Sequence, residues 1–268
     1  MTRYLLALLL LPLPVAAQPV TQADVLQAEL RSGWRAADGS HVAALHLQLA
    51  PEWKTYWRAP GDAGIPPEFD WAGSENLGQI TVHWPRPDVF DFQGMQTIGY
   101  KQDVVLPLTV TPLDPSRPVF LRTSVSMGVC KDICMPASLT LSADLADQGA
   151  PDALISAALA DQPKVGLAAG LTAIFCDLTP LKDGTRVTAR LMLPAEIGAE
   201  TVVMEPDAPV WVSDSMVSRE GAVLTAIADM VPSPGTDFTL DPASLRLTVL
   251  AGDQAMEVTG CPLRQASR

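Results

Sequence analysis

The sequence predicts an all-β fold made of two β-sandwich domains joined by a short, partly helical linker. Apolar and polar side chains alternate with a period of two in the segments 45–49, 119–127, 186–193 and 245–249. Successive side chains of a strand point to opposite faces of a sheet, so each segment is predicted to be a half-buried strand. Proline and glycine punctuate the intervals, as in "APGDAGIPP" and "VPSPGTD". Many short strands separated by such turns are typical of β-sandwiches.

The first seventeen residues, "MTRYLLALLLLPLPVAA", have the pattern of a secretory signal peptide. Arg3 precedes the apolar run, and small residues precede Gln18, where the mature chain is expected to begin. The alternative is an uncleaved anchor, but the unbroken run 5–11 is too short to cross a bilayer. We therefore expect an exported, soluble mature chain without stable membrane insertion.

The composition is acidic, with a formal net charge of −12 that becomes −13 when Arg3 is removed with the signal peptide. Such a surface repels nucleic-acid phosphates and anionic lipid headgroups, so no nucleic-acid partner is expected. The sequence contains no G-x-S-x-G elbow, no H-E-x-x-H motif and no phosphate-binding glycine loop. We predict no cofactor.

Residues 149–165 interrupt the strand pattern and are predicted to form a linker helix. Leu154, Ile155 and Ala158 recur there at helical spacing, and a proline stands at each end of the run. The alternative is an ordinary helix packed on one large domain. The predicted organisation is a signal peptide over 1–17, a first domain over 18–148, the linker over 149–165 and a second β-sandwich over 166–268.

The four cysteines fall into two pairs of different kinds. Pairing Cys176 with Cys261 would close a loop of about 86 residues, which the loop-entropy model values at about 4.6 kcal/mol. Pairing Cys130 with Cys134 would close about five residues and contribute about 2 kcal/mol. An even number of cysteines in an exported chain favours pairing. The spacing therefore favours a structural role for the long link and a reactive role for the short pair.

A turn must separate Cys130 from Cys134 if they are to bond. Residues four apart on an extended strand lie about 13 Å apart, whereas a disulfide needs Cα atoms within about 7 Å. The polar pair Lys131 and Asp132 permits a turn, and Pro136 stiffens the exit. We predict a tight turn between a strand that ends near residue 127 and a strand around residues 139–141.

Three uses of this short pair remain open from the residues alone: redox exchange, a purely structural disulfide and a soft-metal site. Thiolates and thioethers select Cu(I), and four such ligands lie close in sequence, namely Met127, Cys130, Cys134 and Met135. The methionines could equally be ordinary apolar side chains of the hydrophobic core. The three histidines are dispersed and show no zinc-ligand spacing, so we predict no metal site from them: His41, His46 and His83.

Three segments together resemble the N-terminal periplasmic domain of the DsbD thiol:disulfide interchange proteins. They are "EWKTYWRAPGDAGIPPEFDW", "VFDFQGMQTIGYKQDVVLPLTV" and "GVCKDICMPASLTL", which occupy residues 52–71, 89–110 and 128–141. The likeness is strongest to the ScsB-like branch, the suppressors of copper sensitivity. It covers most of residues 25–145, and the second half is similar to the additional β domain of that branch. The resemblance implies two immunoglobulin-like sandwiches and a periplasmic location.

The resemblance also implies a mechanism in which Cys130 and Cys134 cycle between dithiol and disulfide. Cys134 would form mixed disulfides with partners, and Cys130 would resolve them. Phe92 matches the aromatic residue of a loop that caps the cysteines in the family, and Asp91 matches an acidic neighbour. The implied electron donor is a membrane-embedded thiol reductase acting through a thioredoxin-like domain, and the implied acceptors are oxidised periplasmic proteins.

Two features depart from the family pattern. The spacing of Cys130 and Cys134 is shorter than in the best-known DsbD proteins. The sequence also has no membrane-relay region and no thioredoxin-like C-x-x-C, so the partners are expected to be separate chains. Our hypothesis is therefore a periplasmic protein-disulfide reductase component. The alternatives are a Cu(I)-binding or copper-tolerance protein and a non-catalytic β module with two structural disulfides.

If residue 92 caps the cysteines, the variant Phe92→Ala should keep the fold and react faster. We expect a small thiol reagent to attack the Cys130–Cys134 disulfide more rapidly in this variant than in the parent protein. The measurement is the rate of thiol-dependent reduction, with circular dichroism to check the fold. An unchanged rate would remove the cap from the account.

Overall fold

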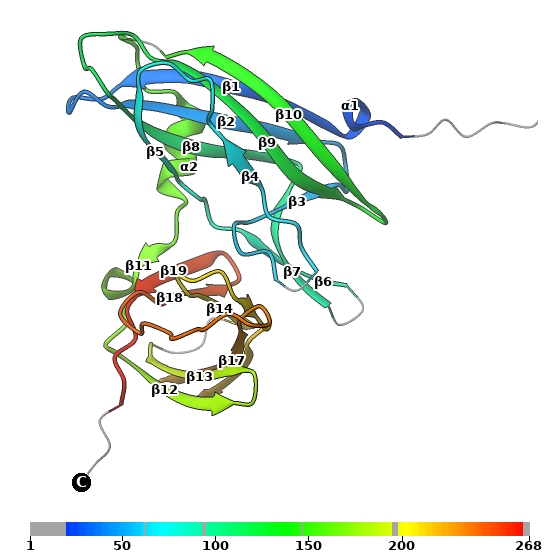
Figure 1. Cartoon of the computed structure of the whole chain (residues 1–268), viewed down its shortest axis with the longest axis vertical. Helices are drawn as coiled ribbons and strands as arrows, with labels where there is room; N and C mark the ends of the chain where they lie inside the picture. Colours follow the sequence, from blue (N-terminus) through cyan, green and yellow to red (C-terminus); the bar gives the residue numbers. More distant parts are fainter. Residues whose placement is uncertain (1–19, 62, 93–94, 146, 195–197, 265–268) are drawn as a thin grey trace, which may run out of the picture.

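The computed structural model describes residues 20–264 except 62, 93–94, 146 and 195–197. The predicted signal peptide lies outside these residues. The predicted all-β class is confirmed, because strands of several antiparallel sheets make up most of both halves (Figure 1). None of the helices within the described residues is long and apolar enough to span a membrane.

The first half is a sandwich of two sheets, with strand orders β1-β2-β8-β5 and β10-β9-β3-β7-β6 and with β4 paired to β9. Its elements are α1 (Gln22–Val25), β1 (Leu26–Arg35), β2 (His41–Leu49), β3 (Lys54–Tyr56), β4 (Glu68–Asp70), β5 (Leu77–Val82), β6 (Asp88–Phe92), β7 (Met95–Lys101), β8 (Asp103–Pro112), β9 (Phe120–Cys130) and β10 (Cys134–Asp144).

The core of this sandwich lies between the two sheets, where the predicted alternation places apolar side chains. Leu45 and Leu47 of β2 share one core cluster with Val125 and Met127 of β9, and all four are almost completely buried. The opposite side chains of β9, such as Ser124 and Ser126, are exposed. Burial of these apolar side chains is the main favourable term that holds the two sheets together.

The alternation in β9 ends at its last three residues, all of which are buried: Gly128, Val129 and Cys130. The strand continues to Cys130, three residues beyond the predicted end. Its partner β10 begins at Cys134, so the two strands form one long hairpin. The end of β9 is covered because β3 pairs with it there. Sequence alternation cannot reveal such cover, since it comes from a distant segment.

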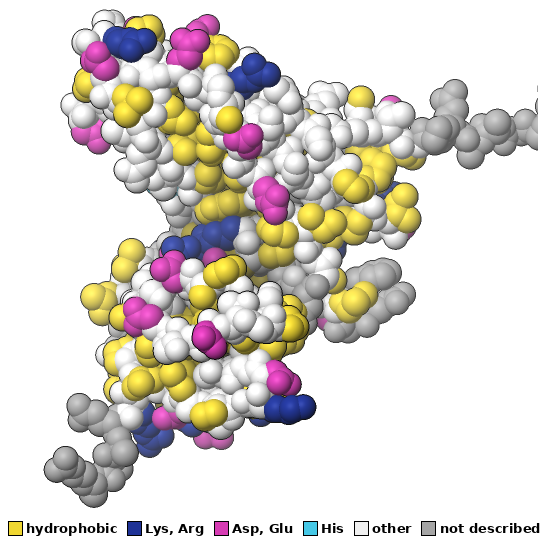
Figure 2. All heavy atoms as spheres, viewed as in Figure 1, with side chains coloured by type: hydrophobic (Ala, Val, Ile, Leu, Met, Phe, Trp, Pro, Cys, Tyr) yellow, Lys and Arg dark blue, Asp and Glu magenta, His cyan; other side chains and the backbone are white. Residues whose placement is uncertain are grey.

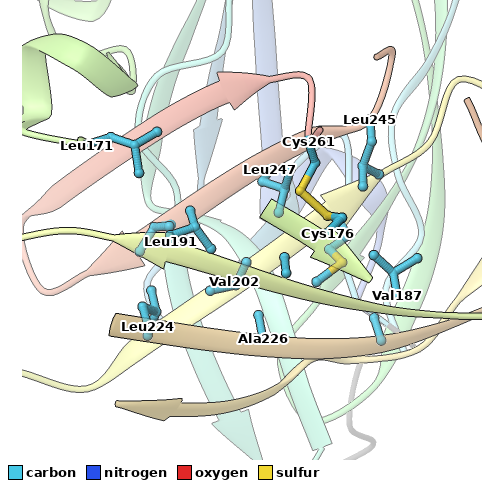
Figure 3. Packing of buried hydrophobic residues seen from close by; sticks show 14 of the residues in the cluster. Leu171, Cys176, Val187, Leu191, Val202, Leu224, Ala226, Leu245, Leu247 and Cys261 are labelled. Atoms are coloured by element: carbon cyan, nitrogen blue, oxygen red, sulfur yellow. A yellow bond between two sulfur atoms is a disulfide. The ribbon is translucent and has the colours of Figure 1, made fainter. Parts of the chain in front are cut away.

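The second half is also a sandwich, with strand orders β11-β19-β18-β14 and β12-β13-β17-β15 and with β16 paired to β17. Its elements are β11 (Lys164–Val165), η1 (Gly166–Ala169), β12 (Ala173–Leu181), β13 (Gly184–Met192), β14 (Glu200–Glu205), β15 (Trp211–Val212), β16 (Met216–Glu220), β17 (Val223–Val231), β18 (Arg246–Ala251) and β19 (Gln254–Thr259). It has its own hydrophobic core, in which Cys176 and Cys261 lie among leucine and valine side chains (Figure 3).

The segment between the sandwiches contains α2 (Ala153–Ala160). Asp152 caps its N-terminus by accepting hydrogen bonds from the backbone N–H groups of residues 154 and 155. The side chain of Ile155 is completely buried against Ala44 and Val105, on the outer face of the sheet that contains β2 and β8. The helix thus connects the halves and also packs on the first one.

The packing of α2 makes a stability prediction. Replacing Ile155 by alanine should leave a cavity against the sheet and lower the free energy of unfolding by about 2–5 kcal/mol. The matched control is Leu154→Ala on the same helix, because Leu154 is 46% exposed and its truncation should change stability by about 0.5 kcal/mol or less. Urea unfolding measures both variants. Equal effects of the two substitutions would contradict the observed orientation of the helix.

Candidate active site at the hairpin tip

Cys130 and Cys134 lie directly opposite each other at the tip of the β9–β10 hairpin and form a disulfide. Their Cα atoms are 4.1 Å apart. The intervening turn consists of Lys131, Asp132 and Ile133, all exposed, and the backbone N–H of Lys131 donates to the carbonyl of Ile133 over 3.1 Å. The predicted turn between the two cysteines is therefore present, and the bond lies at a projecting end of the first sandwich (Figure 1).

The two cysteine residues are unequally exposed to solvent. Cys130 is 1% exposed, whereas Cys134 is an exposed residue. The difference follows from strand order: Cys130 lies on β9, between β10 and β3, while Cys134 lies on the outer strand β10. An attacking thiolate from another molecule can therefore reach Cys134 much more easily than Cys130.

The hydroxyl of Tyr56 lies against the disulfide and donates a hydrogen bond to Sγ of Cys130 over 3.0 Å. The same oxygen is 3.5 Å from Sγ of Cys134. Tyr56 is 2% exposed, and burial raises the pKa of its hydroxyl above the ordinary value near 10. The hydroxyl is therefore protonated at neutral pH and serves as a donor. Such a bond is stronger to a thiolate than to a disulfide sulfur, because the thiolate is charged.

Two glycines make room for the ring of Tyr56. A Cβ atom on Gly64 would lie 2.9 Å from Cδ1 of Tyr56, and one on Gly128 would lie 3.0 Å from Cε2. A larger residue at either position would press on the ring, and also on Cβ of Pro60 at 2.2 Å from position 64 or Cβ of Ile65 at 2.9 Å from position 128. A hydrogen bond from Oγ1 of Thr55 to the carbonyl of Gly128 (2.9 Å) also ties β3 to β9 beside the disulfide.

Two lysines lie near this end of the sheet. Lys54 pairs in register with Cys130, and its ammonium lies 5.0 Å from the ring centroid of Phe90. The ammonium of Lys101 lies 4.5 Å from the centroid of the same ring. Burial, and then the positive charge of Lys101, lower the pKa of Lys54. The Lys54 ammonium also donates to Oγ1 of Thr97 on β7 over 2.9 Å, so it is directed along the sheet away from β9.

Lys131 contributes less to the local field than its place in the turn suggests. Its ammonium forms an ion pair with Glu52, with Nζ 2.6 Å from Oε2. Both side chains are largely exposed, and the hydrogen bond from Lys131 to this carboxylate raises the pKa of the lysine. The charge is thus offset at close range, on a surface where solvent screens it further.

The four sulfurs considered as copper ligands do not share one side of the hairpin. Met127 is buried in the sandwich core, and Met135 packs against that core. Their positions alternate with those of Cys130 and Cys134, so the two pairs belong to opposite faces of the hairpin. Among the described residues, no group of three or more His, Cys, Asp or Glu side chains is arranged to hold a metal ion.

The hairpin and Tyr56 lie within a segment that matches a known family. Residues 22–145 match the family described as "Thiol:disulfide interchange protein DsbD, N-terminal". Residues 22–145 form a DsbD-type N-terminal domain. The predicted resemblance is thereby confirmed, and the first sandwich is immunoglobulin-like, as that resemblance implied.

A solved structure is similar over both sandwiches. The crystal structure of the N-terminal periplasmic domain of ScsB from Proteus mirabilis aligns with a TM-score of 0.65 and 24% sequence identity. The alignment covers 89% of this chain and 92% of that chain, so the fold of both halves is shared. No curated protein sequence matches the chain.

The cap residues expected for a DsbD-type domain lie at the end of the β6–β7 hairpin. The backbone of Phe92 pairs with that of Met95, but the side chain of Phe92 lies outside the described residues. Asp91 pairs with Gln96 in the register and is exposed. Strand β6 belongs to the same sheet as the cysteine hairpin, three strands away from β9. The cap itself remains a prediction.

Cys176 and Cys261 form the second disulfide, with Cα atoms 5.5 Å apart. Both residues are at most 1% exposed and belong to the core of the second sandwich (Figure 3). The bond links β12 to the segment after β19. An external thiolate has no direct route to either sulfur, which is the opposite of the situation at Cys134.

Sequence reasoning assigned no role near the DsbD-type cysteine pair to Tyr56, Lys54 or Gly64. The segment 52–71 resembles the family as a whole, and this likeness assigns no role to any one side chain. A tyrosine between a threonine and a tryptophan, as in Thr55-Tyr56-Trp57, is an ordinary strand pattern. Only the pairing of β3 with β9 brings Tyr56 to the sulfurs, and the sequence pattern contains no signal for that pairing.

The hydrogen bond from Tyr56 predicts slower reduction of the disulfide when the hydroxyl is removed. In Tyr56→Phe, Cys130 would leave as a less stabilised thiolate, and loss of one such charge-assisted bond corresponds to about a tenfold lower rate. The measurement is the second-order rate of reduction by dithiothreitol at pH 7. The matched control is Tyr100→Phe, because Tyr100 is also buried but donates to the carbonyl of Pro85 instead. A rate equal to that of the control would show that the hydroxyl does not act on the sulfur.

Proposed function

We propose that this protein is a periplasmic thiol–disulfide exchange module that passes two electrons from a donor dithiol to oxidised periplasmic proteins through Cys130 and Cys134. The observation that carries the proposal is the asymmetric disulfide: an exposed Cys134 bonded to a buried Cys130, with the Tyr56 hydroxyl 3.0 Å from Sγ of the latter. The DsbD-type match and the periplasmic ScsB domain of similar fold support it.

Reduction begins when a donor thiolate attacks Sγ of Cys134, since this sulfur is accessible. The Cys130–Cys134 bond breaks, and Cys130 leaves as a thiolate that accepts the hydrogen bond of Tyr56. The second thiolate of the donor then attacks its own sulfur in the mixed disulfide, and Cys134 leaves as a thiolate. The donor ends as a disulfide and the module as a dithiol, so two electrons have moved.

Transfer to the acceptor runs through the same sulfur. The Cys134 thiolate attacks a disulfide of the acceptor, and one acceptor thiolate leaves. The Cys130 thiolate then attacks Sγ of Cys134, which restores the internal disulfide and releases the second acceptor thiolate. Each thiolate that leaves acquires its proton from solvent. The buried position of Cys130 suits this resolving role, because it reacts only with its neighbour.

The partners proposed are a membrane-embedded thiol reductase, a thioredoxin-like domain on a separate chain, and oxidised periplasmic proteins. Ile133 lies at the hairpin tip beside Cys134 and is 66% exposed, so it offers an apolar contact to a partner. Ile65 is 44% exposed and lies near Gly128. Hydrophobic side chains are also visible at this projecting end of the molecule (Figure 2). Apolar contacts of this kind suit transient docking of a partner.

We propose the division into domains over 18–148 and 166–268, joined by 149–165, because a separate hydrophobic core lies on each side of α2. We also propose that Asp91 and Phe92 belong to a loop that shields Cys130 and Cys134. The Cys176–Cys261 disulfide stabilises the second domain and takes no part in exchange, since both sulfurs are buried.

Single-cysteine variants test the exchange mechanism. Cys130→Ser keeps the attacking sulfur but removes the resolving one, so it should accumulate mixed disulfides with periplasmic proteins. Cys134→Ser should trap none, because Cys130 is buried. The measurement is the yield of thiol-sensitive complexes on non-reducing gels, with the Cys176–Cys261 pair left intact in both variants. Equal trapping by both variants, or trapping only by Cys134→Ser, would contradict the assigned roles.

A further inference from the structure

We propose that the second sandwich positions Tyr56 through Arg58, so that the reactivity of the Cys130–Cys134 disulfide depends on an ion cluster between the two halves. This inference rests on the proposed function, because it concerns the same sulfurs. Arg58 is a positioning residue in this account. It acts on the sulfurs only through Tyr56.

Arg58 comes from the first sandwich, and its carboxylate partners come from the second. Its Nε and Nη2 atoms lie 2.8 Å from Oε1 and 2.9 Å from Oε2 of Glu205, which is a two-pronged contact. Nη2 also lies 2.5 Å from Oε2 of Glu257. Residue 205 ends β14, and residue 257 lies on β19, so one guanidinium binds two strands of the other sandwich.

The cluster is shielded from solvent, and this makes its contacts stronger than those of surface pairs. The side chains of Arg58, Glu205 and Glu257 are 16%, 18% and 30% exposed. Burial alone would disfavour the charge on Arg58, but the two carboxylates outweigh it and raise the pKa of the guanidinium. Basic and acidic side chains are visible together at the narrow junction between the halves (Figure 2).

Apolar contacts between the sandwiches surround this cluster. Val203, Leu250 and Ala255 of the second half pack with the core residues of the first. Arg246 adds a second guanidinium, with Nη1 3.9 Å from Oε1 of Glu205 and Nε 3.7 Å from Oε1 of Glu257. Two positive and two negative side chains therefore meet at the junction, which balances the charge that burial would otherwise penalise.

The chain connects Arg58 to Tyr56 over a very short path. The guanidinium of Arg58 lies over the ring of Trp57, 4.2 Å from its centroid, and Trp57 is completely buried. The backbone N–H of Trp57 donates to the carbonyl of Ile98 over 3.0 Å. Tyr56 is the residue before Trp57 and the last residue of β3, which is only three residues long. The position of the Tyr56 ring therefore depends on how the chain is held just beyond the end of β3.

The segment after Arg58 returns to the same ring. The carbonyl of Pro60 accepts a hydrogen bond from the N–H of Ile98 over 3.0 Å, and Gly64 lies against the ring of Tyr56. A cavity of about 490 Å³ opens between the halves, and both Arg58 and Gly64 line it. Arg58 and Glu205 of the ion cluster thus line the same cavity as Gly64, the residue that lies against the Tyr56 ring.

Loss of the carboxylate charges would leave Arg58 with an uncompensated charge in a shielded position. The guanidinium would turn toward water, away from Trp57. The chain just beyond the end of β3 would then be held less firmly. Hydrogen bonds weaken steeply with distance and angle, so a small displacement of Tyr56 is enough to reduce its donation to Cys130. The predicted effect is therefore on the rate of reduction, in the same direction as removal of the hydroxyl itself.

A double-mutant cycle tests this chain of contacts. Glu205→Gln combined with Glu257→Gln keeps the shape of both side chains and removes their charge. We expect reduction of Cys130–Cys134 by dithiothreitol to slow by about threefold to tenfold in the Tyr56 background and by less than about 1.5-fold in the Tyr56→Phe background, because contacts that act through one group are not additive. A merely structural role would slow both backgrounds equally.

The matched control is Asp229→Asn, which breaks another two-pronged pair within the second sandwich, between Arg186 and Asp229 at 2.7 and 2.8 Å. It should leave the rate unchanged. Arg58→Lys is a second variant in case the double substitution does not fold, since it keeps the charge but loses the planar fork. Arg58→Lys should also slow reduction of Cys130–Cys134 when Tyr56 is present and have little effect when it is replaced by phenylalanine.

An unchanged rate in a folded variant, or equal slowing with and without the Tyr56 hydroxyl, would overturn the inference. Because the assay uses a small thiol and no protein partner, its outcome is separate from that of the trapping experiment. If Cys130→Ser traps no partner but the carboxylate substitutions still slow reduction only when Tyr56 is present, the proposed function alone is contradicted. If Cys130→Ser traps partners but the carboxylate substitutions do not slow reduction through Tyr56, this inference alone is contradicted.

Discussion

The hydrogen bond from Tyr56 to Sγ of Cys130 is the contact on which the proposed chemistry depends. It gives a physical basis for the different roles that the family resemblance implies for the two sulfurs. Cys130 is a buried residue whose sulfur accepts a hydrogen bond at 3.0 Å, while Cys134 is an exposed residue whose sulfur lies 3.5 Å from the same hydroxyl. In the proposed mechanism this asymmetry gives the disulfide a defined direction of cleavage, with attack at Cys134 and departure of Cys130.

The fold creates this asymmetry through strand order. The β9–β10 hairpin places the cysteines opposite each other, and β3 pairs with only one of its strands. Glycines at 64 and 128 then admit the tyrosine ring. The other disulfide shows the contrast, since Cys176 and Cys261 are enclosed by a hydrophobic core. The two disulfides thus differ in their settings, one at an exposed hairpin tip and the other within a hydrophobic core.

The sequence predicted the fold class, the turn between Cys130 and Cys134, and the family, because these depend on local alternation and on a compact motif. It did not predict the unequal burial of the two sulfurs or the role of Tyr56. Tyr56 is 74 residues from Cys130 in the chain, and Arg58 is 147 residues from Glu205. Contacts between segments so far apart arise from strand pairing and domain packing, which leave no periodic trace in one sequence.

The most direct test of the central claim is the redox equilibrium of the two disulfides in one protein. The protein would be equilibrated in thiol buffers of graded potential, alkylated and analysed by peptide mass. The account predicts that Cys130 and Cys134 become reduced at potentials above about −300 mV, while Cys176 and Cys261 remain bonded there. Resistance of both pairs to reduction down to that potential would contradict it, since a sealed, permanent bond at the hairpin tip cannot carry electrons.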